Sequence, residues 1–168
     1  MRYNAPMSID STALTQRLAA RLLAQGRRIC TAESCTGGLI AKTLTDLAGS
    51  SDWFDRGFVT YSNQAKSDML AVPAAIVDRH GAVSEAVAQA MASGALRHSQ
   101  ADFAVAVTGV AGPGGGSTEK PVGTVWIAVA SGERLEARLH HFDGDRRAVR
   151  DATRDAALAT LLEWIESG

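Results

Sequence analysis

Two candidate nucleophiles are adjacent in the segment TAESCTGG, residues 31–38. The hydroxyl of Ser34 needs a neighbouring base to take its proton before it can attack, whereas the thiol of Cys35 needs less help. The segment follows a short apolar stretch and precedes a helical pattern, which predicts a helix N-terminus whose unpaired N–H groups face an anion. A serine or threonine there can also be a simple helix cap. From these residues alone, capping by Ser34 or Thr36 is the more economical interpretation.

Histidine, the usual base for a serine nucleophile, is not placed for that task in this sequence. The four histidines are expected in a turn, at a helix end and, as an adjacent pair, on a strand where neighbours point to opposite faces: His80, His98, His140 and His141. A base of another type is therefore needed if Ser34 attacks.

The segment FVTYSNQAK, residues 58–66, offers a lysine instead. Tyr61 is expected at a strand end and Lys66 on the helix that follows. A lysine can act as a base when burial or positive neighbours lower its pKa from about 10.4 toward neutrality, and serine–lysine pairs are a known variant of the catalytic triad. Taken alone, Lys66 has the more common role of a solvated helix residue.

A glycine-rich segment and a basic segment complete the candidate chemistry. Six of the fifteen residues from Gly109 to Gly123 are glycine, in TGVAGPGGGSTEKPVGTVW (108–126). This loop matches neither a P-loop nor a dinucleotide fingerprint, so a flexible connection and a backbone-lined ligand cradle both remain open. The segment GDRRAVR places Arg146, Arg147 and Arg150 at a helix start, where the dipole opposes positive charge. An anionic ligand and ion pairs with nearby aspartates explain that placement equally well.

The hydrophobic pattern predicts the elements that position these residues. Helices are expected over 11–25, 37–47, 63–70, 74–78, 84–98 and 145–166, and strands over 28–32, 58–61, 103–107, 124–130 and 135–142. Ser11 is expected to cap the first helix. On the last helix the expected buried stripe is Val149, Ala152, Ala156, Ala159 and Leu162, widened by Leu158, Leu161 and Ile165. Early alternation of helices and strands followed by a hairpin favours a three-layer α/β/α sandwich with a mixed β-sheet. We expect a flexible tail over residues 1–10 and one domain over 11–168.

Composition excludes several classes of protein. The chain has 168 residues, a net charge of −1 and 5% aromatic residues, which disfavours nucleic-acid binding and a membrane-surface role. The N-terminus has no apolar leader and no run reaches membrane-spanning length, so we expect the cytoplasm. Cys30 and Cys35 lack the spacing of a metal site and are expected to be reduced. No metal or cofactor is expected, and a homodimer is compatible with this size.

Five segments in this order resemble the CinA C-terminal domain family: AESCTGG, GFVTYSNQAK, HGAVSE, TGVAGPGGGSTEKPVGTVW and FDGDRRAVR. The resemblance covers nearly the whole chain from about Leu14. The family includes nicotinamide-mononucleotide amidohydrolases, so it implies hydrolysis of that carboxamide to nicotinate mononucleotide and ammonia. The upstream domain of the longer members is missing, which predicts the stand-alone form. Gly114 departs from the family pattern, in which aspartate often follows the proline, so the resemblance assigns no specific ligand contact to this position but still implies the cradle.

The resemblance also implies roles for individual residues. Ser34 matches the nucleophile, Lys66 the general base, and Tyr61 a tyrosine that assists proton transfer or polarises the site. The oxyanion and the substrate, including its phosphate, are expected to meet the small-residue turn, the glycine-rich loop and one arginine: Cys35, Thr36, Gly37, Gly38, Thr108, Gly109, Gly112, Gly115 and Arg146.

Two other functions compete with this interpretation. Cys35 at a helix N-terminus suits a thiolate amidase, although a small buried packing role for this cysteine is favoured. A non-enzymatic nucleotide-binding or regulatory module linked to competence or DNA damage is the other alternative. The presence of Ser34, Tyr61 and Lys66 together argues against an inactive protein.

Overall fold

Five strands form one mixed sheet in the order β2-β1-β3-β4-β5 within residues 10–168, the part of the chain that the computed structural model describes. β1 runs parallel to β2 and β3, whereas β4 is antiparallel to β3 and β5. The mixed sheet expected from the sequence is thereby confirmed. The strand bounds are β1 Ile29–Glu33, β2 Phe54–Val59, β3 Phe103–Gly109, β4 Thr124–Ser131 and β5 Arg134–His141.

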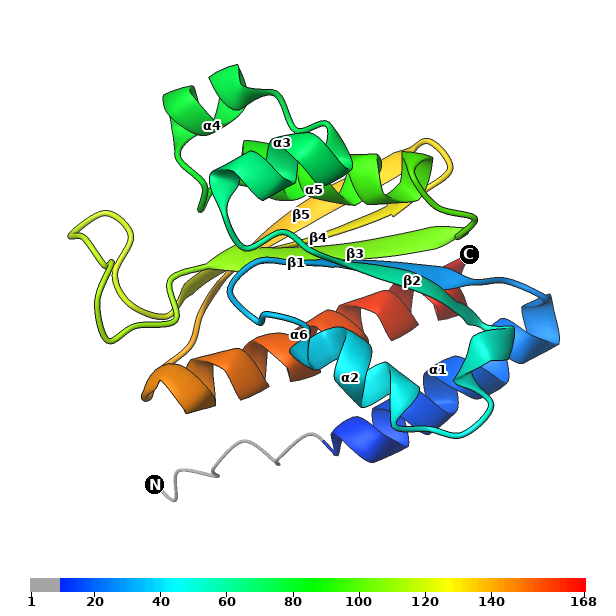
Figure 1. Cartoon of the computed structure of the whole chain (residues 1–168). Helices are drawn as coiled ribbons and strands as arrows, with labels where there is room; N and C mark the ends of the chain where they lie inside the picture. The colour runs from blue at the N-terminus through cyan, green and yellow to red at the C-terminus, as the bar shows by residue number, and fades with distance from the viewer. Residues whose placement is uncertain (1–9) are drawn as a thin grey trace.

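Helices cover both faces of the sheet and complete the expected three-layer α/β/α architecture (Figure 1). One face carries α1 (Ser11–Gln25), α2 (Leu39–Thr45) and α6 (Arg146–Ser167). The other face carries α3 (Asn63–Leu70), α4 (Ala74–His80) and α5 (Glu85–Arg97), and a short 3₁₀ helix (Ser50–Asp52) precedes β2. The tail predicted over residues 1–10 lies outside the described residues except for Asp10. The Asp10 carboxylate accepts from the amide of Thr12 and caps α1 in place of Ser11.

The topology opens a crevice between the carboxyl ends of β1 and β3. From β1 the chain continues through α2 to β2 on one side, whereas β3 lies on the other side of β1 and leads on to β4. In open α/β sheets, ligands bind where neighbouring strands lead away in opposite directions. The main chain joins the two ends directly, because the amide of Ser34 donates to the carbonyl of Val107 at 3.1 Å.

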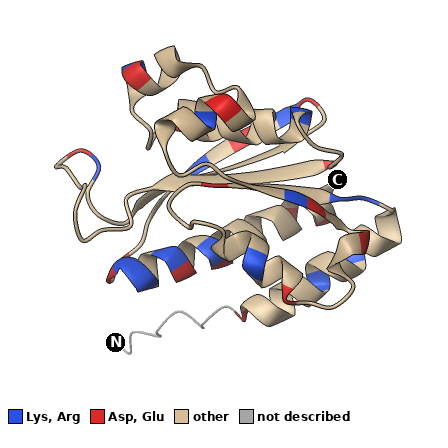
Figure 2. Ribbon diagram, viewed as in Figure 1, with Lys and Arg blue, Asp and Glu red and all other residues tan. Residues whose placement is uncertain are grey.

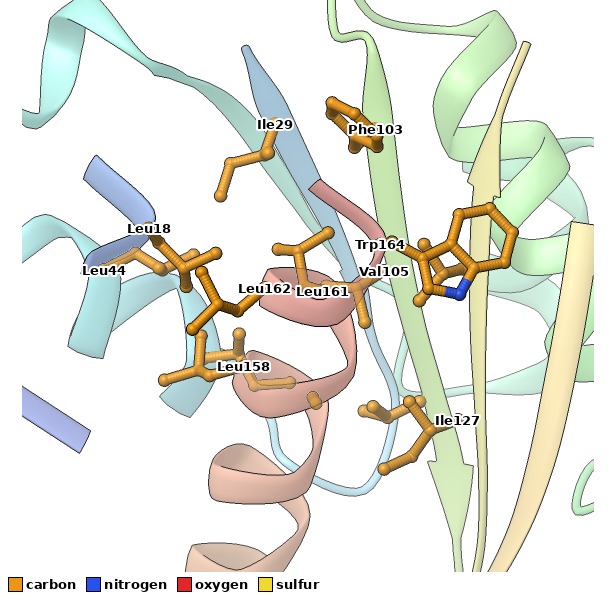
Figure 3. Close-up of a cluster of buried hydrophobic side chains, with 14 of the residues drawn as sticks. Leu18, Ile29, Leu44, Phe103, Val105, Ile127, Leu158, Leu161, Leu162 and Trp164 are labelled. Carbon is orange, nitrogen blue, oxygen red and sulfur yellow. The ribbon is translucent and has the colours of Figure 1, made fainter. Parts of the chain in front are cut away.

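The main core lies between the sheet and the α1/α6 layer (Figure 3). Leucines of α1 and α6 pack there against Ile29, Val105 and Ile127 of the sheet. Burying each such side chain contributes roughly 1.5–3 kcal/mol. On the opposite face α5 comes so close to α3 that a Cβ at Gly94 would overlap the Leu70 carbonyl oxygen. This close packing fixes α3, the helix that carries Lys66.

The structure corrects the predicted strand over residues 58–61. β2 begins at Phe54, within a segment that the sequence pattern predicts to be a loop, and it ends at Val59. β2 is an edge strand whose residues are half-buried or exposed, and it includes the charged Asp55 and Arg56. Such a strand lacks the apolar pattern that marks a central strand. Tyr61 therefore lies beyond the strand, one residue before the Ser62 cap of α3.

The buried face of α6 also differs from the predicted stripe. Val149, Leu158, Leu161, Leu162 and Ile165 are buried as expected. Ala152, Ala156 and Ala159 are only half-buried, and the residue that follows each of them is buried instead: Thr153, Ala157 and Thr160. The threonine hydroxyls donate to the carbonyls of Val149 and Ala156, four residues earlier. That bond satisfies each hydroxyl inside the helix and allows a polar residue on the buried face.

Candidate active site

A buried carboxylate organises the turn that follows β1. Glu33 is 1% exposed and accepts three hydrogen bonds, from the Thr36 hydroxyl at 2.7 Å and from the amides of Ile40 and Ala41 at 2.8 and 3.0 Å. The first free amides of α2 and the positive end of its dipole therefore face the protein's own carboxylate. The amides of Ile40 and Ala41 are therefore not available to a bound anion, and the prediction for the amides of residues 34–38 stays a prediction.

The same turn is held from the opposite side by α6. The Arg150 guanidinium donates to the carbonyls of Cys35 and Thr36 at 3.2 and 2.9 Å. Gly37 and Gly38 have positive φ values of 58° and 104°. Residues with a Cβ rarely adopt that conformation. The two glycines are thus needed for the shape of the turn. We predicted that they also let a ligand approach the backbone closely, but neither glycine lines the cavity described below.

Ser34 and Lys66, thirty-two positions apart in the sequence, meet inside the crevice. The Lys66 amine lies 3.1 Å from the Ser34 hydroxyl oxygen. It also donates to the carbonyls of Thr60 and Tyr61 at 3.2 and 3.3 Å, so α3 directs the side chain back over its own start. All three acceptors are neutral. Lys66, which taken alone is expected to be a solvated helix residue, is in fact only 1% exposed, and Ser34 is 9% exposed.

Burial changes the protonation of Lys66. Removal from water lowers the pKa of the Lys66 amine below its usual value of 10.5, and a smaller electrostatic interaction with Cys35 opposes that shift. Desolvation disfavours the charged form, so a larger fraction of the amine is neutral near pH 7 than for an exposed lysine. A neutral amine within hydrogen-bond distance of a hydroxyl can accept its proton.

Tyr61 takes part through its main chain and, separately, through its ring. Its carbonyl accepts from Lys66, while its phenol is directed outward, 59% exposed for the residue as a whole. The phenol oxygen accepts from the Arg146 guanidinium at 3.0 Å. Arg146 also donates to the carbonyl of Gly112 at 2.8 Å. This arginine therefore links the tyrosine to the glycine-rich loop across the mouth of the crevice.

A cavity of about 320 Å³ lies at this point, and we call it the active-site cavity. Its walls come from the turn after β1, the start of α3, the segment before α5, the glycine-rich loop and α6. They include Ser34, Cys35, Tyr61, Asn63, Lys66, Ala82, Val83, Thr108, Gly109, Val110, Ala111, Gly112, Gly114, Gly115 and Arg146. The volume is at the lower end of the range for small-molecule sites.

The structure therefore brings together most of the predicted site residues and separates a few. Thr36, Gly37 and Gly38 do not line the active-site cavity as the described residues define it. The Thr36 side chain is fully buried against Glu33. Thr108 lines the cavity, and its hydroxyl donates to the carbonyl of Ala82 at 2.8 Å. Gly114, to which the resemblance assigns no specific ligand contact, is part of the wall with the rest of the loop.

Sequence reasoning missed residues of two kinds. Asn63, Ala82 and Val83 line the cavity, and the HGAVSE segment that contains the last two was noticed without a role. Glu33 shapes the turn without lining the cavity. The sequence does contain a signal for Glu33, which is a charged residue at the end of a short apolar strand. A carboxylate buried there requires hydrogen-bond partners close by.

Cys35 is a poor nucleophile in this setting. The residue is 6% exposed and belongs to the main core. Burial raises the pKa of the Cys35 thiol to about 11. A thiol with so high a pKa is almost wholly protonated near neutral pH and unreactive.

The described residues hold neither a grouped metal site nor a membrane-spanning helix. Between Asp10 and Gly168 no three metal-binding side chains of His, Cys, Asp or Glu are grouped as a metal site would require. No helix in the same range has the length and apolar character to cross a membrane.

Comparison with known proteins decides the family. The model of the CinA C-terminal domain matches residues 11–165. The chain belongs to the CinA C-terminal domain family. Several relatives carry the name nicotinamide-nucleotide amidohydrolase PncC, among them proteins from Escherichia coli K12 and Pseudomonas putida. The one from Escherichia coli K12 is 54% identical over 89% of this chain and 92% of its own length. The one from Pseudomonas putida is 52% identical over 90% and 95%.

Solved structures of CinA-family proteins share the fold. A competence/damage inducible protein from Agrobacterium tumefaciens superposes with a TM-score of 0.89 at 47% identity, covering 97% of this chain and 98% of its own. A CinA superfamily protein from Klebsiella pneumoniae gives a TM-score of 0.91 at 41% identity, covering 95% and 99%. In a longer CinA-like protein from Geotalea daltonii the matching region is 37% of the length. The CinA domain is therefore found both alone and as part of longer chains.

Proposed function

We propose that this protein hydrolyses the carboxamide of nicotinamide mononucleotide to nicotinate mononucleotide and ammonia. The observation that carries the proposal is the buried contact of 3.1 Å between the Lys66 amine and the Ser34 hydroxyl, in a cavity at the sheet's switch point. The names of the relatives from Escherichia coli and Pseudomonas putida supply the substrate class. The reaction belongs to the salvage of pyridine nucleotides, and we place it in the cytoplasm.

The acylation step uses Ser34 as nucleophile and Lys66 as base. As the Ser34 oxygen attacks the carboxamide carbon, the neutral Lys66 amine takes the hydroxyl proton. The tetrahedral intermediate then breaks its C–N bond, and the Lys66 ammonium returns the proton to the departing amide nitrogen. Ammonia leaves, and the nicotinoyl group remains on Ser34 as an ester.

Deacylation repeats the sequence with water. Lys66 takes a proton from the water as its oxygen attacks the ester carbon, and the proton passes to the Ser34 oxygen when the ester bond breaks. Nicotinate mononucleotide leaves and the resting pair is restored. One water is consumed, no metal or cofactor is needed, and every proton is carried by Lys66.

The developing oxyanion needs a donor next to the nucleophile. The Ser34 amide is bonded to Val107 and the Gly37 amide to Ser34, both through carbonyls. No backbone carbonyl within residues 10–168 accepts from the Cys35 amide, which directly follows the nucleophile. We assign this amide to the oxyanion, in line with other strand–turn–helix nucleophile sites.

The remainder of the nucleotide is assigned to the opposite wall. Arg146 and the glycine-rich loop are the ligands proposed for the ribose phosphate, since a guanidinium and backbone amides both suit a phosphate. In this assignment the exposed phenol of Tyr61 polarises the site through Arg146 rather than by direct proton transfer. Its oxygen has Arg146 as partner, not Ser34 or Lys66.

The test is to incubate the purified chain with nicotinamide mononucleotide and to measure ammonia and nicotinate mononucleotide together. We expect equal amounts of the two products. Nicotinamide riboside, which lacks the phosphate, is the matched control and should react much more slowly. Tight binding of the mononucleotide without release of ammonia would contradict the proposal and favour a binding module.

A further inference from the structure

A second and larger cavity adjoins the active-site cavity. It has a volume of about 1040 Å³, and we call it the arginine cavity. It shares Ala111 and Arg146 with the active-site cavity, but Ser34, Tyr61 and Lys66 do not line it. One wall is the N-terminal part of α6, which contributes Arg146, Arg147, Arg150 and Arg154. Figure 2 shows this end of α6 as a concentration of basic residues.

The arginines on this wall are arranged at a cost to the helix. Arg146, Arg150 and Arg154 follow one another at intervals of four residues, so like charges lie on one face. They also begin at the positive end of the helix dipole, where a cation is disfavoured. The chain as a whole has a net charge of −1, so this local excess does not come from a generally basic composition.

The carboxylates near these arginines neutralise only part of the charge. Arg147 and Arg154 pair with Asp151, and Arg154 also pairs with Asp155. Within residues 10–168 no carboxylate lies within 4.0 Å of the guanidinium of Arg146 or Arg150. These two side chains donate to carbonyl oxygens and a phenol, and those bonds use only some of the five N–H groups that each guanidinium has. The wall of the arginine cavity carries these four arginines against two aspartates, Asp145 and Asp151, so positive charge exceeds negative charge there.

The other lining residues indicate the rest of the ligand. Leu39, Pro113 and Val122 supply an apolar part of the same lining. The volume is at the upper end of the range that holds a drug-sized molecule, which is far more than an inorganic anion requires. Guanidinium groups recognise phosphate by charge-assisted and often bidentate hydrogen bonds.

We propose that the arginine cavity is a second binding site, distinct from the active-site cavity, for a phosphate-bearing ligand of nucleotide size. Its phosphate contacts Arg150 and Arg154, and its apolar part lies against Leu39, Pro113 and Val122. Such a ligand reaches the same guanidinium groups that hold the catalytic turn and the Tyr61 phenol. The site does not depend on the proposed reaction, because binding is measured without turnover.

The experiment is a titration of the full chain, labelled with nitrogen-15, with three probes followed by NMR. AMP carries both a phosphate and an apolar base, adenosine lacks the phosphate, and inorganic phosphate lacks the base. We expect AMP to shift the Leu39 amide and the Arg154 side-chain signal in a saturable manner, more tightly than inorganic phosphate. Adenosine should have no comparable effect.

Variants then locate the site. Arg154→Gln should weaken AMP binding at these signals about tenfold, the loss expected for one charge-assisted contact. Arg147→Gln should give a smaller loss, because this side chain is 92% exposed. Arg79→Gln is the matched control, an exposed arginine on α4 outside both cavities, and should bind as the unaltered chain does. Thermal unfolding of each variant checks that the fold is retained.

Three results would overturn the proposal. One is AMP shifts confined to the residues around Ser34 and Lys66, which would show that the nucleotide enters only the active-site cavity. Another is AMP affinity at Leu39 that is unchanged in both the Arg154→Gln and Arg147→Gln variants. The last is adenosine binding as tightly as AMP, which would show that phosphate is not recognised.

Discussion

The two segments that face each other across the active-site cavity are held in very different ways. The turn over residues 33–38 is tied by the buried Glu33 carboxylate on one side and by Arg150 on the other. The glycine-rich loop between Val110 and Gly123 is largely exposed from Pro113 to Glu119. Its outer contacts are few and include Arg146 to the Gly112 carbonyl and Lys120 to the His80 carbonyl.

This difference corresponds to a division of tasks. A nucleophile has to be held close to its productive geometry, because a small misplacement is costly to the rate. A surface that accepts the ribose and phosphate has to admit the ligand and release the product, which suits a loop with few anchors. Changes in the turn should therefore lower kcat, whereas changes in the loop should mainly raise KM.

The largest expected effect is at Lys66. Lys66→Met removes the base while keeping a buried side chain of similar length, and ammonia release should fall by about 10³-fold or more. The same variant should be more stable at neutral pH, by on the order of 1 kcal/mol, because a functional group that is costly to bury has been removed. Activity assays and urea unfolding of one preparation measure both quantities.

The pH dependence of stability gives the sign of the Lys66 effect. Folding lowers the pKa of Lys66 below 10.5, so the unfolded chain binds this proton more readily. Wild-type stability should therefore fall, relative to Lys66→Met, as the pH decreases from about 10.5 to the lowered folded value. A constant stability difference across this window would contradict a lowered pKa.

The next effect concerns Glu33, which the cavity wall does not include. Glu33→Gln keeps the shape, but all three donors lose their charged acceptor and the new NH₂ group, itself a donor, faces at least one of them. The free energy of unfolding should decrease by about 2 kcal/mol. The turn should loosen enough to lower kcat about tenfold, with little change in KM. Glu85→Gln, at an exposed position in the first turn of α5, is the control and should change neither quantity. An equal loss in both variants would mean that the turn does not depend on Glu33.

The smallest effect is expected in the loop. Lys120→Ala removes the contact of 2.8 Å to the His80 carbonyl. We expect KM to rise about threefold and kcat to stay nearly constant, as an exposed hydrogen bond contributes little. Glu119→Gln changes the neighbouring exposed charge and should leave both constants unaltered. A fall in kcat larger than the rise in KM would show that the loop, like the turn, positions the reacting groups. The proposed division of tasks between the two segments would then be wrong.

The sequence predicts the central elements better than the edge of the sheet. β3 and β4 are buried on both faces, so their apolar runs identify them directly. The helix over residues 63–70 is also predicted with its observed bounds, since Ser62 caps it and Leu70 is its last residue. The prediction of β2 fails because an edge strand can contain charged residues, which hide the apolar pattern. The predicted buried face of α6 is wrong because two threonines are buried where alanines were expected, and their hydroxyls donate to carbonyls within the helix.

The candidate site could be predicted only as far as residue types allow. Ser34, Lys66 and Arg146 have side chains that can do chemistry, and the order of the segments that contain them is what resembles the family. What brings Ser34 and Lys66 together is the pairing of β1 with β2, which sets Glu33 beside Val59, and the packing of α5 on α3. These are long-range features that no local pattern contains. The role of Glu33 was hidden for the same reason, since its partners are identified only when the turn is folded.

The choice between the two adjacent nucleophiles is tested most directly by ammonia release from nicotinamide mononucleotide in two single variants. Ser34→Ala should reduce the rate to the uncatalysed background while the thermal unfolding temperature stays close to that of the unaltered chain. Cys35→Ser should keep most of the activity, because the Cys35 thiol is buried with a pKa of about 11. Activity retained in Ser34→Ala and lost in Cys35→Ser would contradict the account.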